Sequence, residues 1–194
     1  QKGFEKAGYE AEITDDPGRI DKADGVVLPG VGAFKDCYDG LVNSGLVDVV
    51  VAAARSGRPF LGICVGLQLL FEESEEGVGS RGLGILPGRV VRFPHTAESG
   101  LKVPHMGWNQ ISPVSTDCPL IEDADWQPYM YFVHSYYAKP TSEDIVLATC
   151  DYGVTFPAMV GRDNVFATQF HPEKSQKEGI KLLAAFGRLV KETA

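Results

Sequence analysis

Residues 60–70, FLGICVGLQLL, place a short apolar segment directly before a helical pattern, with a G-x-C-x-G sequence at the junction. Residues 59–63 are of the near-continuous apolar kind that is buried in parallel sheets. A helix predicted over 65–73 follows at once. A strand that passes straight into a helix needs a sharp turn, and glycines on either side relieve the crowding there. The run therefore predicts an α/β sheet with the Cys64 side chain exposed above its carboxyl edge.

The remaining pattern divides the chain into two kinds of structure. A strand over 25–28 and a helix over 41–56 precede the central run, and this alternation predicts an open, mostly parallel sheet with helices on both faces. From residue 83 the chain changes to short extended segments, which predict an antiparallel, β-rich second half with Asp163-Asn164 as a hairpin turn. A final amphipathic helix is predicted over 174–193.

The beginning of the chain resembles the middle of a domain. Residues 1–7 read as the tail of a helix closed by Gly8, residues 10–14 as an extended segment, and Asp16-Pro17-Gly18 as a turn. Such an opening predicts that a first strand of the sheet is missing. We expect one domain over 1–194 that is truncated at its N-terminus.

Composition excludes several classes of protein. The chain has 194 residues, a hydrophobic fraction of 44% and a formal net charge of −8, which exclude overall disorder and argue against nucleic acid or anionic membranes as partners. No apolar stretch approaches the ~20 residues of a membrane helix. The four cysteines form no C-x-x-C pair, so no metal site is predicted. We expect a cytoplasmic protein with reduced thiols.

Cys64 is the best candidate for a catalytic group. A helix N-terminus beside a cysteine favours the nucleophilic thiolate, and the N–H of Val65 is placed for an oxyanion hole. A base is available in Gln169-Phe170-His171-Pro172-Glu173, where residues two apart project to the same side, so that Glu173 can orient the His171 ring. The alternatives are a buried structural cysteine and an ordinary helix-entry loop.

A second oxyanion donor is suggested by residues 28–34, LPGVGAF. Glycines on both sides of Val31 let a peptide plane adopt unusual orientations and let a ligand approach the backbone. The alternative is an ordinary turn at the end of a strand, and the segment alone does not decide between the two.

Together these segments carry a family resemblance. PGVGAF, GICVGLQ, FVHSY and QFHPEKS resemble the class I (triad) glutamine amidotransferases, a flavodoxin-like α/β group. PHMGWN at 104–109 is most similar to the glutaminase subunits or domains of imidazole glycerol phosphate synthases. The resemblance extends from residue 25 to residue 186.

The resemblance implies a role for each matching residue. Cys64 would form a thioester with glutamine, His171 would transfer protons while Glu173 orients it, and the N–H groups of Val31 and Val65 would hold the oxyanion. No cofactor is implied. The implied contacts with the glutamine substrate fall on Gly32, Gln68, Glu76, His134, Ser135 and Tyr136.

The resemblance also implies a partner. Glutaminases of this kind deliver ammonia to a (β/α)₈-barrel cyclase, which makes imidazole glycerol phosphate and an aminoimidazole carboxamide ribotide in histidine biosynthesis. The implied interface is Met106, Gly107, Trp108 and Asn109, where a Trp beside a Met fits an interface hot spot. Two alternatives stay open: another class I amidotransferase or a cysteine peptidase of similar fold, and a non-catalytic subunit that binds a partner.

Overall fold

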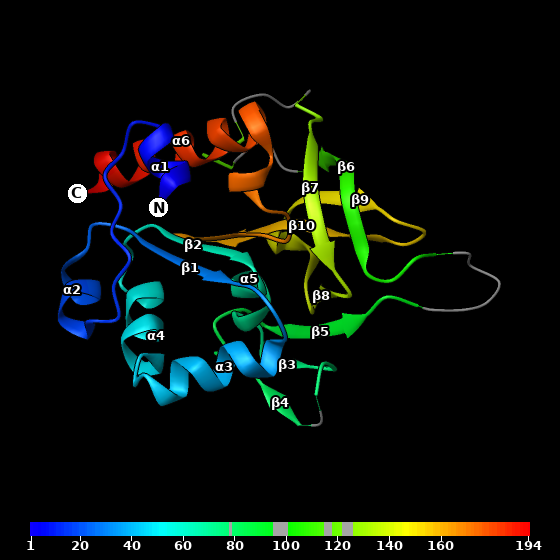
Figure 1. The fold of residues 1–194 in the computed structure, drawn as a ribbon, viewed down its shortest axis with the longest axis horizontal. Coiled ribbons are helices and arrows are strands. Elements are labelled where there is room, and N and C mark those ends of the chain that lie inside the picture. The colour runs from blue at the N-terminus through cyan, green and yellow to red at the C-terminus, as the bar shows by residue number, and fades with distance from the viewer. Residues whose placement is uncertain (78, 95–100, 115–117, 122–125) are drawn as a thin grey trace.

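A seven-stranded sheet forms the centre of the protein in the computed structural model (Figure 1). The structure describes residues 1–77, 79–94, 101–114, 118–121 and 126–194. β2 lies between β1 and β11 and runs parallel to both, whereas the other neighbouring strands pair antiparallel. In order across the sheet, the strands are β1 (Val26–Gly30), β2 (Phe60–Cys64), β11 (Val165–Thr168), β10 (Thr155–Arg162), β9 (Val146–Asp151), β6 (His105–Pro113) and β7 (Tyr129–His134).

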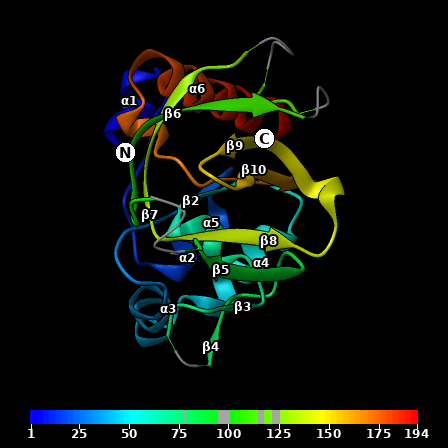
Figure 2. The same ribbon diagram turned by 90° about the vertical axis from the view of Figure 1, so that its right-hand side faces the viewer.

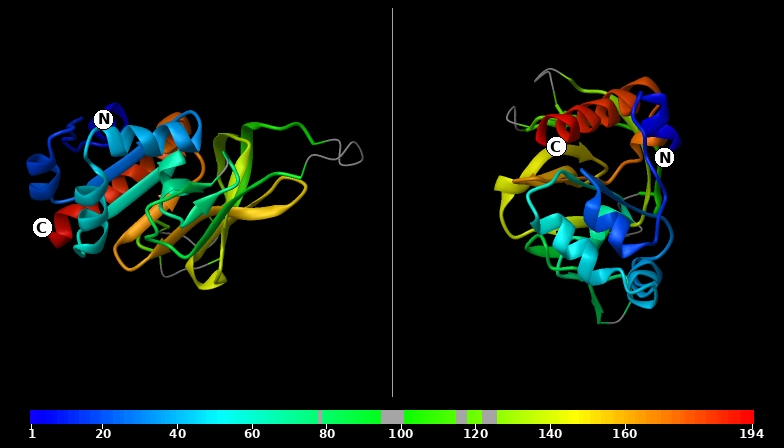
Figure 3. Two further views of the ribbon diagram at one scale, coloured as in Figure 1. Left: turned by 90° about the horizontal axis from the view of Figure 1, so that it is seen from below. Right: turned by 90° about the vertical axis from the view of Figure 1, so that its left-hand side faces the viewer.

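Helices cover both faces of the parallel part of the sheet (Figure 1 and Figure 3). On one face, α1 (Lys2–Lys6) packs against α6 (Gln176–Thr193), whose apolar stripe buries Leu183 and Phe186. Amphipathic spacing of this kind is what lets a surface helix bury one side. The other face carries α2 (Pro17–Lys22), α3 (Phe34–Asn43), α4 (Val47–Arg55) and α5 (Val65–Leu69).

A smaller sheet lies beside the large one (Figure 2). Its strand β8 contacts β10, and it follows β7 after a single residue, Ser135, so one corner of the chain connects the two sheets. Short 3₁₀ turns occur at Glu143–Ile145 and Pro172–Lys174. The strands of the smaller sheet, in order, are β4 (Ser80–Arg81), β3 (Glu73–Ser74), β5 (Gly88–Arg92) and β8 (Tyr136–Pro140).

The predicted α/β class and the antiparallel second half are confirmed. The proportion of parallel pairing was overestimated, because the antiparallel strands join the same sheet as the parallel ones. The hairpin at Asp163-Asn164 was predicted correctly, and it is the connection that brings this about. Asp163 has a φ of 53°, which the two-residue turn requires, and β10 is thereby paired to β11.

Three predicted local elements, a helix, a turn and an extended segment, differ from the structure. The helix expected over 41–56 is two helices bent by 100° at a break that contains Gly45, where φ is +69°. Asp16, expected in a turn, caps α2 by accepting the N–H groups of Gly18 and Arg19. Residues 10–14, expected to be extended, are irregular.

None of the described helices is by itself long and apolar enough to cross a membrane, and α3 with α4 meets that test only as a bent pair.

The helix expected over 65–73 ends at Leu69 because the chain that returns from β4 takes over its carbonyl groups. Leu83 N–H donates to Leu69 at 2.7 Å and Ile85 N–H donates to Leu70 at 2.9 Å. The carbonyls at the end of α5 are therefore satisfied without a further helical turn.

Close packing of α5 against β1 explains the glycines around Cys64. A Cβ on Gly66 would lie 1.9 Å from the carbonyl oxygen of Leu28, and a Cβ on Gly62 would lie 3.0 Å from that of Gly66. A Cβ on Gly30, at the end of β1, would lie 2.9 Å from the Gly66 nitrogen. The helix can approach the strand this closely because these positions have no side chain.

We predict that Gly66→Ala destabilises the protein by about 3 kcal/mol, because the new methyl group must displace backbone atoms. Gly40 is the matched control, since a Cβ there meets nothing within 4 Å and the residue lies inside α3. Gly40→Ala should stabilise by about 0.5–1 kcal/mol through helix propensity. Urea unfolding of both variants measures the difference, and equal stabilities would contradict the packing argument.

Candidate active site

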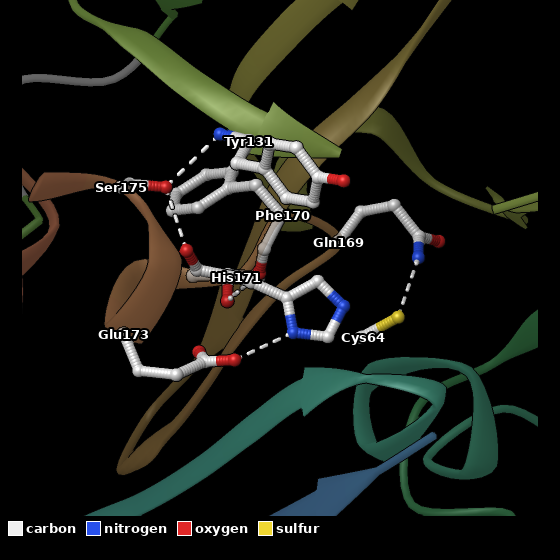
Figure 4. Close-up of polar contacts among 8 residues, drawn as sticks. Cys64, Tyr131, Gln169, Phe170, His171, Glu173 and Ser175 are labelled. Carbon is white, nitrogen blue, oxygen red and sulfur yellow. Dashed lines mark hydrogen bonds and ion pairs between the residues drawn. The ribbon is translucent and has the colours of Figure 1, made fainter. Parts of the chain in front are cut away.

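Cys64 is the last residue of β2 and the N-cap of α5. Its φ of 56° and ψ of −109° lie where a side chain is strained, at a cost of about 1–3 kcal/mol. The sharp strand-to-helix turn predicted from the sequence is therefore confirmed. The side chain is enclosed, with 3% of the residue exposed, where the sequence predicted an exposed one. It is enclosed because Gln169 and His171 lie over it (Figure 4).

His171 and Glu173 meet next to this cysteine. Nδ1 of His171 lies 2.7 Å from Oε1 of Glu173. The opposite ring nitrogen, Nε2, faces the sulfur of Cys64 (Figure 4). Among the described residues, this Nε2 is the one buried side-chain nitrogen or oxygen without a hydrogen-bond partner. Nucleophile, base and orienting carboxylate are thus in the relative order that a catalytic triad requires.

The charges of the pair follow from its surroundings. Burial favours neutral His171, but Cys64 and Glu173 outweigh that effect and raise the pKa of His171 to about 9. Burial favours neutral Glu173 as well, yet the contact with His171 prevails and lowers the pKa of that carboxyl. Near neutral pH the structure therefore holds an imidazolium against a carboxylate, with its free nitrogen directed to the sulfur.

The position of His171 is fixed by its backbone. Its N–H donates to the Tyr131 carbonyl of β7 at 2.9 Å, and its own carbonyl accepts the hydroxyl of Ser175 at 2.6 Å. Ser175 in turn accepts the Tyr131 N–H at 3.0 Å (Figure 4). The base is thereby attached to β7, although it follows β11 in the sequence.

The loop after β1 lies at the same edge of the sheet as the nucleophile. In the parallel register, Gly30 pairs with Cys64, so Val31 and Val65 follow at equivalent positions. The Cys37 thiol donates to the Val31 carbonyl at 3.3 Å, and Gly32 has a φ of +100°. This placement is what two oxyanion donors need, and the oxyanion role of Val31 and Val65 stays a prediction.

Glu76 lies beside that loop. Its Oε2 accepts the N–H of Phe34, the first residue of α3, at 2.8 Å. Glu72 and Glu73 fall within the helix predicted over 65–73, whereas α5 ends at Leu69, so neither glutamate is helical. Glu72 and Glu75 instead accept the backbone N–H groups of Gly88 and Arg92.

A buried pair of amide side chains connects α5 to the nucleophile. Gln68 Nε2 donates to the Tyr136 carbonyl at 2.9 Å and to Oε1 of Gln169 at 3.1 Å. Gln169 Nε2 then donates to Cys64 Sγ at 3.9 Å. Gln68 is 3% exposed, so a direct contact with substrate, which stays a prediction, would fall to its own Oε1.

A second buried chain continues from the same carbonyl. His134 Nδ1 lies 2.9 Å from the Tyr136 oxygen, which only accepts, so this nitrogen carries the proton. His134 Nε2 therefore accepts from His105 Nδ1 at 3.1 Å, and His105 Nε2 accepts from Asn109 at 3.3 Å. Burial among aromatic rings lowers the pKa of His105 to about 4 and that of His134 to about 3. The His134 side chain is thus engaged inside, and the substrate contacts predicted for His134 and Ser135 stay predictions.

β6 presents two different faces. Met106 and Trp108 are 62% and 46% exposed, and Tyr129 of β7 beside them is 59% exposed. Asn109 lies on the opposite face, where it donates to the Asp151 carbonyl at 2.8 Å. Of the predicted interface residues, the structure therefore brings Met106 and Trp108 together and directs the Asn109 side chain away.

Most of the chain is similar to known proteins. Residues 4–188 match the family model described as glutamine amidotransferase class-I. Over 190 residues the chain is 58% identical to the imidazole glycerol phosphate synthase subunit HisH of Syntrophotalea carbinolica, covering 96% of this chain and 92% of that protein. The chain belongs to the HisH family of class I glutamine amidotransferases. Its similarity to the subunit of the same name from Geobacter sulfurreducens is 50% identity over 192 residues, covering 97% and 91%.

Solved structures agree on the fold. A structure described as a glutamine amidotransferase matches with a TM-score of 0.74 at 19% identity, covering 98% of this chain and 91% of that one. PurLQS from Thermotoga maritima matches with a TM-score of 0.72 at 20% identity, covering 98% and 89%. The resemblance drawn from the motifs is confirmed at the level of the family by the family model and the HisH relatives. Membership in this family excludes the cysteine-peptidase alternative and a different amidotransferase family.

Two members of these buried hydrogen-bonded chains were missed in the sequence. Gln169 was read only as part of the QFHPEKS motif, and His105 only as part of PHMGWN. A polar residue at the end of an apolar strand, next to a predicted base, was the available signal for Gln169. No local signal distinguishes His105, because its partner His134 is 29 residues away.

We predict that His105 makes the protein less stable in acid. Its folded-state pKa is lowered, so between pH 6.5 and about 4 the unfolded chain binds a proton that the folded chain does not, and stability falls as pH falls. His105→Gln should therefore lose about 2 kcal/mol less unfolding free energy than the wild type between pH 7 and pH 5. Urea unfolding at both pH values measures this, and equal losses would argue against a neutral buried His105.

Proposed function

We propose that this protein hydrolyses L-glutamine to glutamate and ammonia through a thioester at Cys64. The observation that supports this most strongly is the arrangement of Cys64, His171 and Glu173 at the turn after β2. The membership in a glutamine amidotransferase family supplies the substrate class.

The proposed mechanism gives each residue of this arrangement a role. The Cys64 thiolate attacks the side-chain amide carbon, and the oxyanion that forms is held by the N–H groups of Val31 and Val65. The imidazolium of His171 gives its Nε2 proton to the departing nitrogen, so ammonia leaves and the thioester remains. Water then attacks the thioester while Nε2 accepts its proton, and cleavage of the C–S bond releases glutamate. Glu173 keeps the ring oriented through both steps.

Substrate recognition is assigned to groups around this turn. The Glu76 carboxylate at the start of α3 is suited to the substrate ammonium group, and Gly32 leaves room for a ligand beside the Val31 loop. The backbone N–H groups of residues 134–136 are assigned to the substrate carboxylate, which can only accept hydrogen bonds. This segment lies beside Gln68 of α5.

The ammonia is proposed to pass to a partner. Free ammonia is mostly protonated near neutral pH and is then no nucleophile, so release into water would waste it. The relatives named imidazole glycerol phosphate synthase subunit HisH support a partner within that synthase. We propose that this partner is a cyclase of (β/α)₈-barrel fold that uses the ammonia in histidine biosynthesis. Its products would be imidazole glycerol phosphate and an aminoimidazole carboxamide ribotide. The face of Met106, Trp108 and Tyr129 is suited to bind this partner in a heterodimer, since exposed aromatic and Met side chains are typical of interface centres.

A glutamine-mimicking electrophile tests the reaction directly. We predict one covalent adduct per chain, located at Cys64 by peptide mapping, and none in Cys64→Ala. The partly exposed Cys37 is an internal control, because simple thiol accessibility would label it first. A folded wild-type protein that forms no adduct at Cys64 would favour the alternative of a non-catalytic, partner-binding subunit.

Trp108→Ala tests the partner surface. Loss of a large aromatic side chain from the centre of an interface costs about 2 kcal/mol, so we predict binding of the cyclase to weaken roughly 30-fold. Val42 of α3 is 50% exposed and lies on a different element, and Val42→Ala is the matched control. Isothermal titration calorimetry of the cyclase with each variant measures the change in affinity. Equal affinities for the wild type and Trp108→Ala would place the interface elsewhere.

A further inference from the structure

Gln169 lies between the end of β11 and the sulfur of Cys64. It follows β11, two residues before His171, and it is 0% exposed. Its backbone N–H donates to the Ala158 carbonyl at 2.9 Å. β11 runs parallel to β2 with Thr168 paired to Ile63, so the next residues along, Gln169 and Cys64, are also neighbours.

The orientation of the Gln169 amide is decided by its neighbours. The Tyr136 backbone carbonyl can only accept, so the Gln68 group facing it is the donating Nε2. The same Nε2 donates to Gln169, which must therefore present its oxygen to Gln68. The Gln169 nitrogen is left to face the sulfur of Cys64 at 3.9 Å (Figure 4).

The sulfur consequently has two different neighbours. His171 Nε2 faces it from one side, and the Gln169 N–H group from another (Figure 4). An N–H donor stabilises a thiolate more than a thiol, because hydrogen bonds to ionised acceptors are stronger and shorter. The long distance is as expected before substrate binds, since such contacts tighten in the reacting complex.

We infer that Gln169 is a positioning residue that holds the Cys64 sulfur in place for attack and favours its thiolate form. The inference rests on the proposed glutaminase function. Gln68 and the Tyr136 carbonyl act behind Gln169 by fixing which end of its amide faces the sulfur. A purely structural role would need no donor directed at the nucleophile, because an apolar side chain of the same size would fill the space without any polar group to satisfy.

The test is the pH profile of Cys64 alkylation by iodoacetamide, which requires neither glutamine nor a partner. Gln169→Met keeps the size and removes the donor. We expect the midpoint of its profile to rise by about one pH unit, because the thiolate loses an N–H donor. Glutamine turnover should fall through kcat while KM changes little, because the inferred role of Gln169 acts on the Cys64 sulfur and the proposed substrate contacts lie on other residues.

Thr168→Val is the matched control. Thr168 is equally buried, precedes Gln169 in the chain, and donates its hydroxyl to the Phe170 carbonyl at 3.0 Å, so its loss affects stability without removing a donor to sulfur. Its alkylation profile should match that of the wild type. If Gln169→Met does not fold, Gln169→Glu keeps the shape and puts a negative charge at the sulfur, and its midpoint should rise further.

An unchanged midpoint in folded Gln169→Met, or an equal shift in Thr168→Val, would overturn the inference. Failure of the proposed function would show differently: wild-type Cys64 would then form no adduct with the glutamine mimic, whatever the alkylation profiles of the variants.

Discussion

The close contact between α5 and β1 is the constraint on which the rest of the site depends. Because Gly66 lies against the Leu28 carbonyl, the chain must turn within one residue after β2, and Cys64 takes up that turn at a φ of 56°. The same contact places Val65 beside the loop that follows β1. Nucleophile and both candidate oxyanion donors are therefore positioned by backbone packing, before any side chain contributes.

The base reaches the nucleophile through the mixed character of the sheet. β11 is parallel to β2, so its carboxyl end lies next to Cys64 and delivers Gln169 and His171 there. β7, which belongs to the antiparallel part of the sheet, fixes the His171 backbone because the Tyr131 carbonyl accepts the His171 N–H. The exposed side chains of Met106 and Trp108 lie on β6, the strand paired to β7, so the proposed partner surface is one strand away from the strand to which the base is bonded.

The sequence was informative where chemistry and turn geometry coincide in a few adjacent residues. The G-x-C-x-G turn, the His171–Glu173 contact and the Asp163-Asn164 hairpin are local, and all three were predicted correctly. The end of α5 was predicted wrongly, because the Leu69 carbonyl accepts the N–H of Leu83 from beyond β4, a contact that no periodicity reveals. The final helix, predicted over 174–193, was close to α6.

Contacts between distant residues were the part that the sequence could not supply. The buried chain from Asn109 through His105 and His134 depends on the pairing of β6 with β7, and the role of Gln169 depends on the parallel register of β11 with β2. Alternation along β6 would have separated Asn109 from Trp108, had the strand been recognised as half-buried.

The unbonded Nε2 of His171 and the positive φ of Cys64 are both unfavourable for folding. A buried nitrogen without a partner costs about 1–3 kcal/mol, and the strained backbone costs a similar amount. Both costs fall on the two residues that react. The neighbouring core, by contrast, contains the fully buried rings of Phe132, Phe156 and Phe170, which favour folding. Reactivity and thermal robustness are therefore opposed at this point of the fold, and the aromatic core is what makes such a site tolerable.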